Sequence, residues 1–394
     1  MKCEIAKNIY WVGAVDWNVR NFHGHTYTTK RGTTYNAYLI VDEKITLVDT
    51  VHGPFAHEMF ERIREIVPVE KIDYLIANHV ETDHSGAIAD LVKLCPKIRI
   101  FGTQKCKEGL QKHYYGNWDF QVVKSLEKLK IGSRSLTFLE APMLHWPDSM
   151  FTYLGDDQIL MPNDAFGQHY ASSRRFDDEV PEADLMDEAA KYYANILWSF
   201  SGLVVKKIEE VVKLNIPIRM IAPSHGIIWR KDPGKIIGAY TKWGKNDTEN
   251  KVVIAYETMW GATEKIARAI SEGISSSGME FKIFDLAVTD RTEVIKEMLS
   301  AKGYLIGSST HNNGMLTNAA GFIDFLKGLK PKNRLASVFG SFGWAGGAVK
   351  EIEKILEENG IKIAQPGLSI QYMPSPEELK RAFLFGQEFS RNLL

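Results

Sequence analysis

Cysteine is scarce in this sequence, and positive and negative charges nearly cancel. Only Cys3, Cys95 and Cys106 occur among 394 residues, and no two of them form a Cys-x-x-Cys pair. This argues against an iron–sulfur cluster, a rubredoxin-type iron centre or a zinc ribbon, and it fits a reducing compartment better than a disulfide framework. The formal net charge is -1, which leaves no broad electrostatic footprint for nucleic acid or anionic lipid.

Long apolar runs are also missing. No stretch approaches the roughly 18 uninterrupted apolar residues of a membrane helix. Glu4 and Lys7 interrupt any apolar signal core near the N-terminus, so no secretion signal is expected. We therefore expect a cytoplasmic protein with no membrane or nucleic-acid partner. With 44% hydrophobic and 25% charged residues the composition is globular, and the length suggests about two or three domains.

Short apolar strands, turns and occasional helices fill the chain up to about residue 245. Apolar runs bounded by polar residues predict strands, and one segment with helical spacing predicts a helix. The predicted strands are residues 9–15, 35–41, 45–48, 72–77, 136–139, 158–161 and 219–222, and the predicted helix is 55–66.

The segment after the strand at 72–77 carries four potential metal ligands within six residues: His79, Glu81, Asp83 and His84. In an extended stretch the first three project to one side, and His84 turns inward where a helix starts near Ser85. Two imidazoles and two carboxylates this close repel and desolvate one another unless a cation compensates them. We therefore interpret the segment as a metal site rather than a polar loop that caps a helix.

Three more candidate ligands follow later strands. His145 comes after the strand at 136–139, Asp164 after 158–161, and His225 after 219–222. Each is weak alone, because a single histidine after a strand is more often a hydrogen-bonded structural residue. Strand ends are where layered folds build their sites, so the seven residues together make a plausible ligand set.

The pattern changes after residues 244–250, a polar stretch that reads as a linker. Strands at 251–256, 281–286 and 303–307 alternate with helices at 263–276 and 293–299. This alternation predicts a doubly wound parallel sheet.

Three strand-end loops of this second half are candidate cofactor-binding segments, and the first of them favours a bound phosphate. Hydroxyls, a glycine and a helix N-terminus in the first loop make a phosphate cradle, while both the Gly-x-Gly-x-x-Gly and the Gly-Lys-Ser/Thr signatures are missing. Trp344 is a candidate stacking residue, with an exposed loop aromatic as the alternative. The candidate cofactor residues are Thr258, Met259, Trp260, Gly261, Ala262, Thr263, Thr310, His311, Asn312, Asn313, Ser341, Phe342, Gly343, Trp344, Ala345 and Gly346.

The motif order of the first half resembles the metallo-β-lactamase superfamily, and the first loop of the second half resembles the flavodoxin phosphate loop. The zinc hydrolases of that superfamily usually carry His-x-His-x-Asp-His, whereas the second position here is Glu81. A carboxylate in place of imidazole hardens the ligand set and favours iron over zinc. Over essentially its whole length the sequence is similar to the flavodiiron proteins, or A-type flavoproteins.

This resemblance implies an αββα sandwich of two mixed sheets over residues 1–248 and a flavodoxin-like FMN-binding sheet over 249–394. It implies two non-haem irons. His79, Glu81 and His145 would hold one, Asp83, His84 and His225 would hold the other, and Asp164 would bridge them. FMN would bind at the three loops of the second half. His23 and Tyr193 are candidate pocket residues, and either can equally be structural.

The implied activity is reduction of O2 to water, of NO to N2O, or of both. We expect no third domain after residue 394, and therefore a separate electron donor, such as rubredoxin or a reduced deazaflavin. The resemblance also implies a head-to-tail homodimer, which could pair into a tetramer. Two alternatives compete: a zinc hydrolase fused to a flavodoxin-like module, which Glu81 disfavours, and an electron carrier with a vestigial metal domain, which the complete ligand set disfavours.

Overall fold

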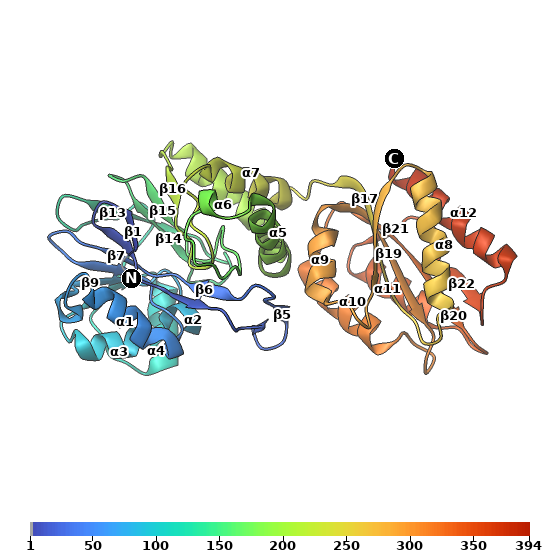
Figure 1. Ribbon diagram of the computed structural model, residues 1–394, viewed down its shortest axis with the longest axis horizontal. Coiled ribbons are helices and arrows are strands. Elements are labelled where there is room, and N and C mark those ends of the chain that lie inside the picture. The colour runs from blue at the N-terminus through green and yellow to red at the C-terminus, as the bar shows by residue number, and fades with distance from the viewer. Residues whose placement is uncertain (1–2) are drawn as a thin grey trace. The chain divides into compact units, whose positions relative to one another are not determined.

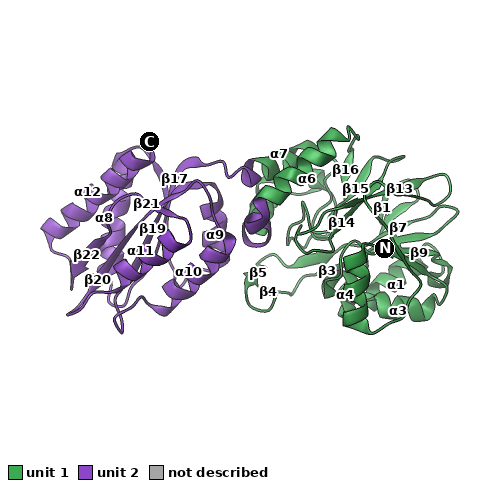
Figure 2. Cartoon of the chain, turned by 180° about the vertical axis from the view of Figure 1, so that it is seen from behind, with its two compact units in different colours: residues 1–193, 202–241 green, residues 194–201, 242–394 purple. Residues whose placement is uncertain are grey.

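The computed structural model describes residues 3–394, and Figure 1 shows the course of the chain. The chain divides into two compact units, coloured separately in Figure 2. Unit 1 comprises Met1–Tyr193 and Gly202–Thr241, and unit 2 comprises Ala194–Ser201 and Lys242–Leu394. Each unit has a hydrophobic core of its own.

Unit 1 is built on two mixed β-sheets. The first has the order β1 (Cys3–Ala6), β2 (Ile9–Trp11), β7 (Tyr38–Ile40), β8 (Thr46–Val48), β9 (Tyr74–Ile76), β10 (Arg99–Gly102) and β11 (Phe120–Val122). The second has the order β12 (Lys128–Lys130), β13 (Ser135–Glu140), β14 (Met150–Leu154), β15 (Ile159–Met161) and β16 (Met220–Ile221). Two short ribbons join β3 (Ala14–Asp16) with β6 (Thr33–Tyr35), and β4 (Asn21–Phe22) with β5 (Tyr27–Thr28).

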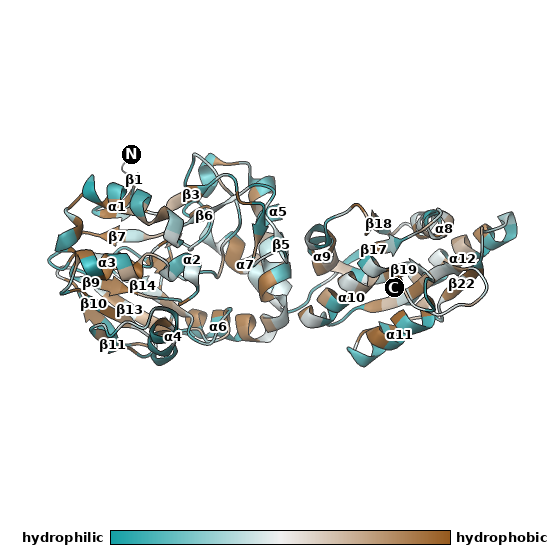
Figure 3. Ribbon diagram, turned by 90° about the horizontal axis from the view of Figure 1, so that it is seen from below, coloured by the Kyte–Doolittle hydropathy of each residue, from teal (hydrophilic) through white to brown (hydrophobic). Residues whose placement is uncertain are grey.

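The core of unit 1 lies between these two sheets. Tyr38 and Phe101 of the first sheet belong to the same buried cluster as Phe138 and Met161 of the second, and Figure 3 shows hydrophobic stretches along β13 and β14. Helices α1, α3 and α4 lie beside the first sheet, and α6 and α7 beside the second (Figure 1), so the predicted αββα sandwich is confirmed. The helices are α1 (Ala56–Arg64), α2 (Thr82–Ser85), α3 (Ile88–Leu94), α4 (Gln104–Tyr114), α5 (Glu182–Tyr192), α6 (Ser201–Lys213) and α7 (Pro233–Gly244).

Two predicted strands of unit 1 are each broken in two. The prediction for residues 9–15 corresponds to β2 and β3, and that for 35–41 overlaps β6 and β7. The breaks face each other at Gly13, where an added Cβ would lie 2.1 Å from the carbonyl oxygen of Tyr35. The two segments keep the same antiparallel register on both sides of this close backbone approach, and only the strand assignment is interrupted there, which alternation of apolar residues does not reveal.

Unit 2 contains a parallel six-stranded sheet. Its order is β18 (Glu280–Asp285), β17 (Glu249–Glu257), β19 (Ala301–Ser309), β20 (Leu335–Phe342) and β21 (Lys362–Ile363), with β22 (Leu368–Gln371) also paired to β20. Helices α8 (Ala262–Ser276) and α12 (Pro376–Leu393) cover one face, and α9 (Arg291–Ser300) and α10 (Thr317–Leu329) the other; α11 (Ala348–Glu358) follows β20. This order is that of a flavodoxin-like sheet, so the predicted doubly wound fold is confirmed.

The binding loops of such a sheet lie at the carboxyl ends of its strands, on both sides of the point where the strand order reverses. The first, third and fourth strands in chain order, β17, β19 and β20, are neighbours in the sheet. Their end loops therefore meet at one edge. Among residues 3–394, no helix combines the length and the apolar character of a membrane span.

Candidate metal centre and cofactor cavity

One buried carboxylate ties together the two loops that carry most of the predicted metal ligands. Asp49 Oδ1 accepts a hydrogen bond from the backbone N–H of Asn78 at 2.8 Å, and Oδ2 accepts from the side-chain amides of Asn78 and Asn163 at 3.0 and 3.1 Å. Asn78 precedes His79, and Asn163 precedes Asp164. Burial raises the pKa of Asp49, although the nearby His84 and these hydrogen bonds oppose the rise.

The ligand loop itself runs from β9 into a short helix. The helix α2 begins at Thr82, three residues before the predicted start near Ser85. Ser85 Oγ donates back to the carbonyl oxygens of Val80 and Glu81 at 2.6 and 3.0 Å. Asp83 and His84 therefore lie on a helical turn, while His79 and Glu81 precede it.

A first group of metal-binding side chains consists of His79, Glu81, His145 and Asp164, whose donor atoms all lie within 4.8 Å of one another. Glu81 Oε2 is 3.3 Å from His79 Nε2 and 3.4 Å from His145 Nε2. Asp164 Oδ2 is 3.5 and 3.6 Å from the same two nitrogens. Ligand atoms about 2.1 Å from a shared ion lie about 3.0–3.5 Å apart, so this group has the spacing of a coordination shell.

A second group consists of Asp83, His84 and His225. Asp83 Oδ2 is 3.1 Å from His225 Nε2 and 3.4 Å from His84 Nε2. The other oxygen of Asp164, Oδ1, is 3.1 Å from His84 Nε2 and 3.5 Å from His225 Nε2. Asp164 therefore presents one carboxylate oxygen to each group, which is the arrangement of a carboxylate bridge.

Unsatisfied carboxylate oxygens show that this cluster fits bound cations. Asp83 is 7% exposed and Asp164 1% exposed. Both oxygens of Asp83 and Oδ2 of Asp164 are buried without a hydrogen-bond partner. Burying such oxygens without compensation is costly, and a cation at the shared point of each group removes that cost.

The acidities of these carboxyl groups reflect the same charge pattern. Burial opposes ionisation of Asp164, but the charges of His84, His79 and His145 hold the pKa of Asp164 well below its usual range. Burial likewise opposes ionisation of Glu81, but hydrogen bonds from His145, His23 and His79 hold its pKa well below its usual range. The carboxylates are thus ionised at neutral pH, which is the state that binds metal.

Two of the histidines are oriented by acceptors outside the ligand set. His79 Nδ1 donates to Asp148 Oδ2 at 3.0 Å, and the same oxygen accepts from the backbone N–H of Val80 at 2.8 Å. His225 Nδ1 donates to the carbonyl oxygen of Thr34 at 2.6 Å. A ring that donates from Nδ1 can present Nε2 to a metal once the metal displaces the proton on Nε2. Sequence reasoning missed Asp148 as a site residue, although it lies three residues after His145 in the same loop.

The two predicted pocket residues lie in different surroundings. His23 Nε2 is 3.1 Å from Glu81 Oε1. Tyr193 is fully buried and packs edge-on against Tyr240, with ring centroids 4.9 Å apart. The hydroxyl that reaches the ligand set belongs to the preceding residue, Tyr192, which donates to Asp164 Oδ1 at 3.0 Å. Successive residues of a helix point in directions about 100° apart, so a shift of one residue decides which tyrosine faces the ligands.

In unit 2, three buried hydroxyls gather under the loop between β17 and α8. Thr263 Oγ1 lies 2.9 Å from Ser309 Oγ and 2.8 Å from Ser341 Oγ. Ser309 Oγ also accepts from the backbone N–H of Met259 at 3.4 Å. The hydroxyl of Thr258 is buried without a hydrogen-bond partner. Gly261, with φ +81°, precedes the first turn of α8, whose free N–H groups suit a phosphate.

A cavity of about 680 Å³ lies at the same edge of the sheet. Twelve of the sixteen predicted cofactor residues line it: Met259, Trp260, Ala262, Thr310, His311, Asn312, Asn313, Ser341, Phe342, Gly343, Trp344 and Ala345. Thr258, Gly261, Thr263 and Gly346 are not among its lining residues. Ser309, at the end of β19, lines it as well, and so do Tyr372 and Met373. Tyr372 and Met373 were missed, because the turn after β22 carries no phosphate-loop pattern.

The cavity has the size and chemistry that FMN requires. Its volume lies within the range of cofactor sites, about 300–1,000 Å³. Trp260 and Trp344 are 86% and 90% exposed on its wall, and aromatic faces of this kind stack on flat ring systems. No lysine or arginine lines it, so hydroxyls and backbone N–H groups are left to bind a phosphate.

Comparisons with known proteins give a family match for each half of the chain. Residues 33–226 match the ODP family of β-lactamase-like domains, and residues 254–386 match the flavodoxin family. The chain is 51% identical to the nitric oxide reductase of Moorella thermoacetica, covering 99% of this chain and 98% of that protein. It is 41% identical to the anaerobic nitric oxide reductase flavorubredoxin of Escherichia coli K12, covering 99% and 82%.

Solved structures show the same architecture. Rubredoxin oxygen:oxidoreductase from Desulfovibrio gigas is 36% identical and superposes with a TM-score of 0.98, covering 100% of this chain and 98% of that one. The flavodiiron protein of Giardia intestinalis is also 36% identical, with a TM-score of 0.96 and coverage of 100% and 97%. From the two ligand groups, the flavodoxin-like cavity and these full-length similarities, we conclude that the chain belongs to the flavodiiron protein family.

Proposed function

We propose that this protein reduces NO to N2O, O2 to water, or both, at two non-haem irons, with electrons that pass through FMN from a separate donor. The observation that carries the proposal is Asp164, which offers Oδ2 to one ligand group and Oδ1 to the other. The names of the relatives, nitric oxide reductase and rubredoxin oxygen:oxidoreductase, support the two candidate gases.

The proposed assignment of ligands follows the two groups. His79, Glu81 and His145 would hold one iron, Asp83, His84 and His225 would hold the other, and Asp164 would be shared by both. Glu81 supports iron over zinc, because three carboxylates in seven ligands make a hard, anionic set. A hydrolase has no evident use for the flavin cavity, so the zinc alternative is not favoured.

When bound, two adjacent irons supply neighbouring sites for a diatomic gas, and FMN supplies electrons to them. The chain's own residues hold this arrangement. Asp148 and the carbonyl of Thr34 orient His79 and His225, and Tyr192 holds Asp164 through Oδ1. His23 stays in the proposal as a pocket residue because Nε2 contacts Glu81. The role of Tyr193 as a pocket residue remains a prediction from the sequence.

FMN is proposed to occupy the cavity at the ends of β17, β19 and β20. Hydroxyls of Thr258 and Thr263 and the first turn of α8 would bind its phosphate, and Trp344 would pack on its ring. We propose a domain boundary at residues 248 and 249, supported by the start of β17 at Glu249. The donor is proposed to be rubredoxin or another external carrier, and the name flavorubredoxin of one relative supports that choice.

Assembly and location are proposed from the family resemblance. Trp260, Trp344 and Tyr372 expose 86%, 90% and 61% of their surface around the cavity, and clustered exposed aromatics favour an interface. We propose a head-to-tail homodimer, with a tetramer as a possible further step, in the cytoplasm. Dilution until the protein is monomeric, followed by sedimentation, tests the assembly: turnover should fall in parallel with the dimer fraction, and a fully active monomer would refute it.

The first test is the metal and flavin content of purified protein, followed by anaerobic reduction and titration with NO and O2. The expected result is two irons and one FMN per chain, with rapid reoxidation by at least one gas. Asp164→Ala should lose iron and turnover, because it removes an oxygen from both groups. Asp90→Ala is the matched control, since Asp90 is an exposed carboxylate paired with Lys93. Zinc without iron, in cells grown with ample iron, would instead support the hydrolase.

A further inference from the structure

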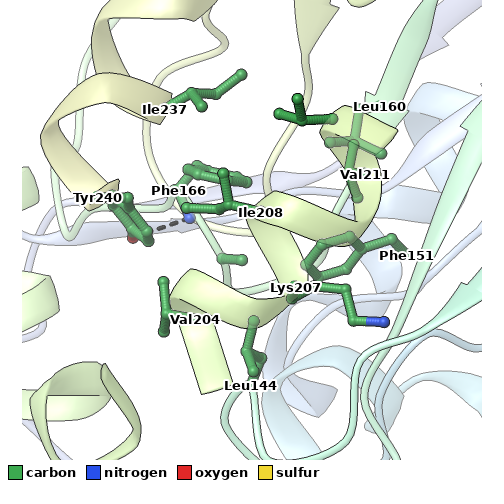
Figure 4. A pocket seen from close by; sticks show the side chains of 12 residues that line it. Leu144, Phe151, Leu160, Phe166, Val204, Lys207, Ile208, Val211, Ile237 and Tyr240 are labelled. Atoms are coloured by element: carbon green, nitrogen blue, oxygen red, sulfur yellow. Dashed lines mark hydrogen bonds between the residues drawn. The ribbon is translucent and has the colours of Figure 1, made fainter. Parts of the chain in front are cut away.

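A small apolar cavity lies in unit 1 between the second sheet and the helices α6 and α7 (Figure 4). Its volume is about 40 Å³. Phe151 of β14 and Leu160 of β15 form the sheet side, Val204 and Ile208 of α6 and Ile237 of α7 form the helix side. All five are hydrophobic, and nothing in the reaction described above uses this space.

The polar atoms of the two polar residues on its wall each make a hydrogen bond within the protein. Tyr240 Oη accepts the backbone N–H of Phe166 at 2.8 Å, which Figure 4 shows as a dashed line. Lys207 Nζ bonds to Glu210 Oε2 at 2.7 Å. A water molecule needs two to four polar partners to occupy a cavity, whereas dry apolar cavities bind uncharged guests such as xenon. The cavity therefore suits a small apolar molecule and not water.

The lining of the cavity includes an exposed residue of α6 and two buried residues that are chain neighbours of candidate metal ligands. Val212, on its α6 side, is 66% exposed. Leu144 and Ala165, at its other side, are only 4% and 1% exposed. Leu144 is bonded to His145, and Ala165 is bonded to Asp164. Its inner wall is thus made of the residues adjacent to one ligand of the first group and to the bridging carboxylate.

We propose that this cavity is a holding site for an apolar diatomic gas, NO or O2, on its way to the metal centre. The inference rests on the proposed function, because only an enzyme with a gas as substrate has a use for such a site. Both gases are uncharged and poor hydrogen-bonding partners, so they transfer favourably from water to an apolar wall. Partition into the cavity raises the gas concentration beside His145 and Asp164.

Xenon tests the site directly in the intact protein loaded with iron and FMN. Crystals of the holoenzyme are pressurised with xenon, and density is expected between Val204, Leu160 and Phe166. In solution, xenon pressure should raise the KM of the wild-type enzyme for its gas and leave kcat unchanged. No xenon density at this position overturns the proposal, and so does xenon density without any effect on KM.

A substitution that fills the cavity gives a second, independent test. Val204→Leu adds a methylene to the wall and should raise the KM for the gas at least about threefold at unchanged kcat, the signature of lost substrate delivery rather than lost chemistry. Leu203→Phe, at the exposed neighbouring position on α6, is the matched control and should leave both constants unchanged. If Val204→Leu does not fold, the xenon measurements on the unaltered enzyme still decide the matter.

The two proposals fail in different ways. If the fully loaded wild-type enzyme turns over neither NO nor O2, the proposed function fails, whatever xenon shows. Normal turnover with unchanged KM in Val204→Leu refutes only the holding site.

Discussion

Single residues outside the ligand set decide how the ligands point. His79 and His225 follow strands of different sheets, yet each ring donates from Nδ1 to a buried acceptor. His79 donates to Asp148 Oδ2, and His225 donates to the carbonyl oxygen of Thr34. Both rings therefore aim Nε2 at the carboxylates of the cluster. Such partners fix the ring tautomer and raise the basicity of the ligand, and their loss commonly costs about 10–100-fold in metal affinity.

Asp148→Ala should weaken retention of iron by about 10–100-fold. The substitution removes the acceptor of both His79 Nδ1 and the backbone N–H of Val80. The measurement is iron per chain after dialysis against a graded chelator. Asp148→Asn is the matched variant: it keeps an acceptor of the same shape and loses the charge, so its retention should lie between those of wild type and Asp148→Ala. Equal retention in all three proteins would contradict the role.

Tyr192→Phe should lower kcat by about tenfold, because a hydrogen bond to a charged group contributes about 1.5–3 kcal/mol. The lost bond is the one from Tyr192 Oη to Asp164 Oδ1. Tyr193→Phe, one residue along, is the control, and steady-state turnover of both gases is the measurement. A loss in Tyr193→Phe alone would restore the role predicted from sequence and refute that of Tyr192.

At the scale of elements, a close helix crossing holds the flavodoxin-like unit together. The helices α8 and α12 pack on the same face of the sheet, with glycines where their backbones meet. A Cβ added at Gly273 would lie 2.0 Å from the carbonyl oxygen of Phe383, and one added at Gly386 would lie 2.2 Å from that of Ile270. Neither clash can be relieved by a flexible side chain, because both neighbours are backbone atoms.

Gly386→Ala should lower the unfolding free energy of this unit by about 1–3 kcal/mol, the usual cost of overpacking. Gly321→Ala in α10 is the opposite control: an added Cβ there meets no atom within 4 Å, so the unit should gain about 0.5–1 kcal/mol from better helix propensity. Chemical denaturation followed by flavin fluorescence measures both. Equal stability of Gly386→Ala and wild type would show that the helices can move apart without cost.

At the scale of the whole chain, two separate hydrophobic cores predict two separate responses to ligand removal. The candidate metal ligands all belong to unit 1, and the proposed flavin cavity belongs to unit 2. A ligand that binds only the folded state stabilises the unit that holds it. Metal and flavin should therefore protect different calorimetric transitions.

Chelation of the iron should lower the melting temperature of the unit 1 transition by roughly 5–10 °C, if the metal is present at about 100 times its Kd. The unit 2 transition should stay in place. Removal of FMN is the reciprocal control and should shift only the second transition. Differential scanning calorimetry measures both, and a single transition that moves equally under either treatment would show that the two cores unfold together.

The local sequence pattern alone predicted the fold of unit 2 and a metal site in unit 1. The alternation of strand and helix after residue 250 predicted the doubly wound sheet, and the density of ligands between His79 and His84 predicted a metal site, because backbone periodicity sets which neighbouring side chains share a face. The prediction of iron rather than zinc depended on a single position, Glu81. The assignment of each ligand remains a prediction.

Only the tertiary structure determined which residues far apart in the sequence contact one another. Asp49 joins Asn78 to Asn163, and Thr34 accepts from His225, 191 residues away. Three other features were also set by tertiary packing. They are the split of the first strands at Gly13, the contact of Tyr192 rather than Tyr193 with Asp164, and the apolar cavity beside Leu144. Each depends on how separate strands and helices pack, and side-chain periodicity along one segment contains no information about the segment that comes to lie against it.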